Sequence, residues 1–129
     1  MNPHYDIAAW EKQALASIED GVAQALAAAN HDRTHIDAQT KLHVEGRVPF
    51  VRAILELNNA GTQPSMMAMA FVSAAGSLLA TVASMFEDDD RQIMFDQLNK
   101  CVAALLAGQM PVGSKGSITQ VNAVPGGHA

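Results

Sequence analysis

The sequence predicts an all-α fold: a single-domain bundle of four or five helices with a central, largely buried helix at about 66–86 and an irregular C-terminal tail. Two observations predict it. The 21 residues from Met66 to Phe86 carry no charge, and apolar residues recur at three- and four-residue intervals in the segments on either side. At 129 residues the chain has the length of one domain. We therefore expect a helical domain at 1–107 and a tail at 108–129, flexible in isolation or ordered by a partner.

A first helix is predicted between about Asp6 and Ala29. Asp6 is of a residue type that accepts hydrogen bonds from the first free amides of a helix. Charged residues fall mostly off the apolar stripe, so the pattern indicates an amphipathic helix. The stripe consists of Ile7, Trp10, Ala14, Ile18, Val22, Ala25 and Ala29.

The polar stretch after the first helix permits two interpretations. Thr34 is a candidate cap for a short helix running to about Glu45, whereas the alternation around residues 40–46 also permits a short strand. We favour the helix and expect Gly46 to end it. Pro49 suits the first turn of the next helix, where its missing N–H is not needed, and Gly61 follows the end of that helix.

The uncharged run is either a membrane span or a helix buried in a soluble protein, and its composition favours burial. Ten of its 21 residues are strongly apolar, while the other eleven are Ala, Ser, Gly and Thr, which drive insertion weakly. Neither end carries Trp or Tyr, and the residues that follow are acidic rather than basic. A small single-span membrane protein stays open as an alternative.

The same run predicts a surface for protein contact. On a helix, small residues gather on one side and bulky residues on the other, and a small face lets another backbone approach closely. Leucine at Gly76 or Ala80 is then expected to overpack that contact, by about 1 to 3 kcal/mol or more. Acidic residues at the end of the run extend the surface toward a basic partner. The predicted interaction residues are Ser73, Gly76, Ser77, Ala80, Ser84, Glu87, Asp88, Asp89 and Asp90.

A last amphipathic helix is predicted from Arg91 to Ala107 and ends at Gly108. One of the aspartates before it is expected to cap it, and the others to complement its positive N-terminus. Its apolar positions are Ile93, Met94, Leu98, Cys101, Val102, Leu105 and Leu106.

Charge and cysteine content limit the partners and the compartment. The net charge is −5 with no basic patch, which disfavours binding to nucleic acid or to an anionic membrane surface. Cys101 is alone, so no intramolecular disulfide forms, and the N-terminus lacks the pattern of a secretory signal. We expect a cytoplasmic protein that does not enter a membrane.

Residues capable of chemistry are sparse. His31 and His35 are four residues apart, with Asp32 and Asp37 among them, and on one helix they would point the same way and share a metal ion. No Cys pair or further motif completes the ligand set, and no nucleophile elbow or phosphate loop is present. We expect no cofactor and no catalysis. The expected function is protein contact, as an adaptor, assembly or inhibitor protein that forms a homo-oligomer; a metal-binding protein or metal-dependent enzyme is the alternative.

Overall fold

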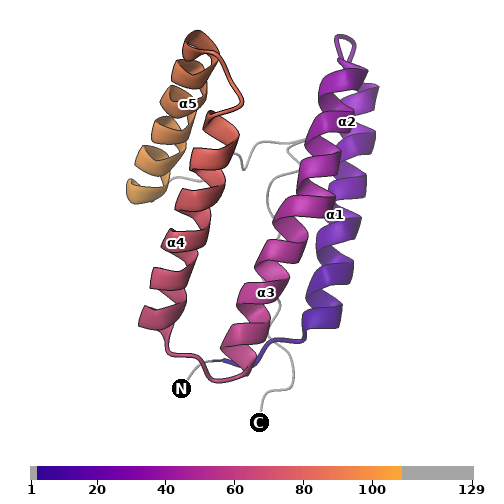
Figure 1. Cartoon of the computed structure of the whole chain (residues 1–129). Coiled ribbons are helices and arrows are strands. Elements are labelled where there is room, and N and C mark those ends of the chain that lie inside the picture. Colours follow the sequence, from indigo (N-terminus) through magenta and orange to yellow (C-terminus); the bar gives the residue numbers. More distant parts are fainter. Residues whose placement is uncertain (1–2, 109–129) are drawn as a thin grey trace. The chain divides into compact units, whose positions relative to one another are not determined.

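The computed structural model describes residues 3–108 and is all-α, which confirms the predicted fold class. Because α2, η1 and α3 follow one another without a break, the described residues form four continuous helical segments (Figure 1). The elements are α1 (Ile7–Ala27), α2 (Arg33–Leu42), the π-helical turn η1 (His43–Arg47), α3 (Val48–Asn59), α4 (Pro64–Ala83) and α5 (Asp88–Leu106).

The described chain divides into two compact units, and each is described by itself. Unit 1 covers residues 3–67 and holds α1 through α3 and the first residues of α4. Unit 2 covers residues 68–108 and holds the rest of α4 together with α5. The predicted tail at 108–129 lies outside the described residues except for Gly108, so the predicted boundary there stays a prediction.

Unit 1 has a closed apolar core between α1 and α3. Trp10, Ala14 and Ile18 succeed one another at four-residue spacing on α1 and are buried against Val48 and Leu55. This is the face that the helical period predicts for α1, and it is confirmed. Half-buried side chains surround the cluster: Tyr5, Ile7, Val22, Val44 and Val51.

The residues that precede α1 are held against the end of α3. The side-chain amide of Asn59 accepts a hydrogen bond from the Tyr5 N–H at 2.9 Å and donates one to the Tyr5 carbonyl at 2.8 Å. The buried Asn58 donates from Nδ2 to the Pro3 carbonyl. These bonds satisfy backbone groups that belong to no helix. Asp6 then caps α1 as predicted, accepting from the Ala9 N–H at 3.0 Å.

The predicted cap of the second helix is wrong by two residues. Asp32, not Thr34, is the N-cap: its carboxylate accepts from the His35 N–H at 3.2 Å, and α2 begins at Arg33. The choice of helix over strand for residues 34–45 is confirmed. Aspartate is as good a cap as threonine, and the position two residues earlier lets the helix start sooner.

Gly46 does not end a helix, contrary to the prediction. It lies inside η1, where the Val48 N–H bonds to the His43 carbonyl five residues back instead of four. Pro49 is the second residue after η1, and a proline ring inside an α-helix clashes with the carbonyl four residues earlier. The wider turn of η1 relieves that clash, so the chain continues from α2 into α3.

The uncharged run forms a helix, but the predicted burial is wrong within unit 2, which holds most of that helix. α4 spans Pro64–Ala83, and only 6% of its most apolar stretch is buried. Ala83 is its one buried residue. Absence of charge shows that a segment tolerates burial, but it does not say which surface covers the segment.

Candidate interaction surface

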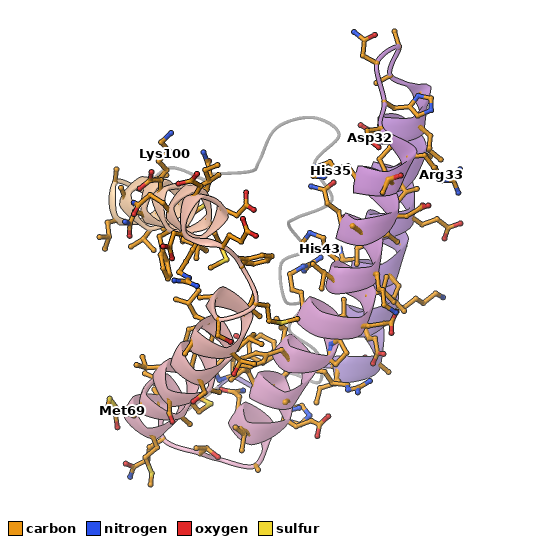
Figure 2. The ribbon with its side chains drawn as sticks, turned by 45° about the horizontal axis from the view of Figure 1, so that its top comes forward. Asp32, Arg33, His35, His43, Met69 and Lys100 are labelled. Atoms are coloured by element: carbon orange, nitrogen blue, oxygen red, sulfur yellow. The ribbon has the colours of Figure 1, made fainter. Side chains whose placement is uncertain are left out.

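The bulky side chains of α4 are exposed along the helix. Met69 is 69% exposed and stands clear of the ribbon in Figure 2. Among the described residues, α4 is also the helix that is long and apolar enough to cross a membrane by length and composition. The exposed large side chains of α4 and of the turn after it are Met66, Met69, Phe71, Val72, Leu78, Leu79, Met85 and Phe86.

The small face of α4 is exposed as well. A Cβ added at Gly76 would meet no atom within 4 Å, so the expected overpacking by leucine has no cause within one molecule. Thr81 Oγ1 donates to the Ser77 carbonyl at 2.9 Å, and Ser84 Oγ donates to the Thr81 carbonyl at 2.7 Å. Both hydroxyls are therefore satisfied by backbone carbonyls three or four residues earlier. The predicted interaction residues on this face, Ser73, Gly76, Ser77, Ala80 and Ser84, are all exposed.

The acidic residues after α4 form the start of α5. Glu87 occupies the N-cap position without a side-chain cap bond, so the expected capping by an aspartate is wrong. Asp88, Asp89 and Asp90 lie in the first turn, where negative charge complements the helix dipole, and all four acids are exposed.

Arg91 fixes the turn between α4 and α5. Its Nε donates to the Ala83 carbonyl at 2.9 Å and its Nη2 donates to the Phe86 carbonyl at 2.7 Å. Its Nη1 also pairs with Asp88 at 3.1 Å. The guanidinium thus joins the last residue of α4 to the turn that follows it, and the Ala83 carbonyl, which also accepts from the Phe86 N–H at 3.2 Å, is shared between the two donors. Sequence reasoning missed this role, because the pattern marks Arg91 only as a polar residue at a helix start.

The apolar stripe of α5 is covered unevenly. Met94, Phe95 and Cys101 are half-buried, whereas Val102, Leu105 and Leu106 nearer its end are 54%, 56% and 85% exposed. Within unit 2, the backbones of α4 and α5 do not approach each other closely. The unit is therefore an open helical hairpin that is fixed at its turn and exposes apolar side chains on both helices.

The histidines considered for a metal site do not lie on one helix. His31 precedes the N-cap, and its Nδ1 lies 2.9 Å from the Ala28 carbonyl, whereas His35 is in the first turn of α2 (Figure 2). Asp32 is engaged as the cap, and Asp37 pairs with Arg33 at 3.0 Å. Across residues 3–108, no three His, Cys, Asp or Glu side chains converge as a metal site would require.

A histidine that the sequence reasoning left unassigned has an altered environment on η1. His43 Nδ1 accepts a hydrogen bond from Arg47 Nε at 2.8 Å, one turn along the helix. Partial burial, together with the positive charge of Arg47, lowers the pKa of His43. Burial also lowers the pKa of Arg47. The neutral imidazole is therefore the form that this turn stabilises.

The chain matches no protein-family model, no curated protein and no solved structure.

Proposed function

We propose that this chain is a non-catalytic helical protein that works through protein–protein contacts, made by the apolar side chains of α4 and α5. The observation that carries the proposal is the contrast between the units. Unit 1 has a closed core and leaves four of its large apolar residues exposed, whereas unit 2 has no such core and leaves most of its large apolar residues exposed. Exposed apolar surface of this extent is typical of interaction sites rather than of monomers.

The contact surface is defined here as nine apolar residues of unit 2, called the α4–α5 surface. It comprises Val72, Leu78, Leu79, Met85, Phe86, Leu98, Val102, Leu105 and Leu106. None of these residues carries charge, so binding there is driven by removal of apolar area from water. An adaptor, assembly or inhibitor role is consistent with such a surface.

Chemical cross-linking in native extract tests the proposal. Val72, on α4, is 61% exposed, so Val72→Glu places a charge on the surface without disturbing a packed residue. We expect this variant to lose the cross-linked species that the wild-type chain forms and to bind less of a hydrophobic dye. Gln97→Glu, at an exposed polar position on α5, is the matched control and keeps both. Unchanged cross-links and dye binding in Val72→Glu would refute the proposal.

A single-span membrane protein is the second candidate, because the length and composition of α4 permit a span. The charged residues of α5, Asp96 and Lys100 among them, do not enter hydrocarbon, so a bilayer would cover the apolar residues of α4 and leave those of α5 exposed. Flotation with phosphatidylcholine vesicles tests this candidate. If the full chain stays at the bottom of the gradient, the membrane candidate is eliminated.

A further inference from the structure

We propose that the partner of the α4–α5 surface is a second copy of this chain. The inference rests on the proposed function and names its partner. Each copy would place apolar side chains of its open hairpin against those of the other, giving four helices that bury what neither hairpin buries alone.

The size of the surface fits a dimer. At roughly 150 Å² for a fully exposed large side chain, the exposed fractions of the α4–α5 surface present roughly 800 Å². A stable protein interface of standard size takes about 800 Å² from each partner. One copy therefore offers what one half of such an interface requires.

Charge also favours self-association through this surface rather than another. The net charge of −5 makes two copies repel each other wherever acidic faces meet. Asp96 and Lys100 are each two residues from Leu98, which places them about 200° away around α5, and Lys100 stands on the outer side of the helix in Figure 2. Between Leu98 and Leu106 the apolar side of α5 carries no charge, so two acidic chains meet there without opposing like charges, whereas the four acids at 87–90 adjoin Phe86 at the turn.

The geometry of unit 2 supplies the space for a second copy. α4 and α5 are joined at the Arg91 turn but their backbones do not approach closely, and exposure on α5 is greatest at Leu106, far from that turn. A helix from an identical hairpin carries the same kind of apolar stripe and is matched in length. A helix of the second copy then packs at the end of the hairpin far from the Arg91 turn, where α4 and α5 would pack against each other in a closed bundle.

Sedimentation equilibrium of the full chain over a wide concentration range tests the proposal. We expect the wild type to approach twice 13.6 kDa. Val102→Glu should raise the dimer dissociation constant roughly tenfold or more, because the interface would bury an unpaired carboxylate. Ile93→Glu is the matched control: Ile93 is 60% exposed against 54% for Val102, and nine residues at about 100° each place it on the opposite side of α5. We expect Ile93→Glu to dimerise like the wild type.

The reactivity of Cys101 locates the contact. Cys101 is the single cysteine and lies beside Val102 on α5, so dimerisation should slow its labelling by a maleimide as concentration rises. Labelling that is independent of concentration, or equal loss of dimer in both variants, would refute this surface as the dimer contact. A strict monomer that still binds hydrophobic dye would refute the second copy alone. A strict monomer that binds no dye would refute the proposed function as well.

Discussion

Trp10 provides the sharpest test of the structure of unit 1. Its side chain is 0% exposed at the centre of the core, yet its indole Nε1 has no hydrogen-bond partner among residues 3–108. Burying an unsatisfied donor costs about 1 to 3 kcal/mol, and that penalty is present in the folded state. Removing the N–H donor should therefore regain part of the free energy of unfolding that is lost when the bulk of the indole is removed.

Two substitutions separate these effects. Trp10→Ala leaves a large cavity and should lower the free energy of unfolding by about 3 to 5 kcal/mol. Trp10→Phe keeps most of the volume and removes the N–H, so a packing loss of about 1 to 2 kcal/mol is offset by relief of the unsatisfied donor. We expect a net change within about 1 kcal/mol of the wild type for Trp10→Phe.

The measurement is urea unfolding followed by circular dichroism. Because Trp10 is the single tryptophan, fluorescence of the wild type identifies which part of the transition belongs to unit 1. Leu15→Ala, on the same helix at a 39% exposed position, controls for changes in helix propensity and should change the unfolding free energy by less than about 1 kcal/mol. If Trp10→Phe is as damaging as Trp10→Ala, the indole N–H makes a bond in solution and the reasoning fails.

Three further predictions concern single hydrogen-bonded positions. The pKa of His43 is lowered from 6.5, by partial burial and then by Arg47, so the folded state disfavours its protonation. The stability contributed by neutral His43 is therefore fully present above pH 6.5 and is lost as the pH falls toward the lower pKa of the folded state. The urea concentration at the unfolding midpoint should drop in that pH window for the wild type, and should drop less for His43→Gln. Asp32→Ala removes the cap of α2 and should cost about 1 kcal/mol in thermal unfolding, whereas Asp37→Ala, which breaks an exposed ion pair, should cost less than about 0.5 kcal/mol. Arg91→Lys retains the charge but loses the forked bonds to two carbonyls, so amide hydrogen exchange at the end of α4 should accelerate; unchanged exchange would contradict that role.

The helices of unit 1 were predictable where the signal is a repeating pattern of residues. The prediction failed where it rested on a single residue. The stripe through Trp10, Ala14 and Ile18 identified the buried face of α1, because burial repeats with the helical period. Gly46 predicts a helix end, yet glycine is tolerated inside a helix for about 1 kcal/mol. Pro49 is accommodated by the wider π-helical turn, which no residue pattern in the sequence indicates.

The helix that carries the candidate surface was predictable, but the surroundings of that helix were not. The charge-free letters of residues 66–86 located a helix and its two faces, and both faces exist as expected. Arg91 was missed because its role depends on where a preceding helix ends in space. His43 and Arg47 are four residues apart, a spacing that brings side chains together on any helix, but the sequence does not reveal the partial burial that lowers the pKa of His43.

The sequence of α4 does not determine whether the helix is buried, and burial in turn affects how stable the helix is. An isolated helix of this length is marginal in water, and most helical stability in proteins comes from tertiary packing. α4 contains Gly76, several serines and β-branched residues, which are weaker helix formers than alanine. With few of its side chains covered by the chain, α4 draws little stability from packing within one molecule. Association through the α4–α5 surface would therefore stabilise α4 itself, and its amide protection should rise with protein concentration in step with dimer formation.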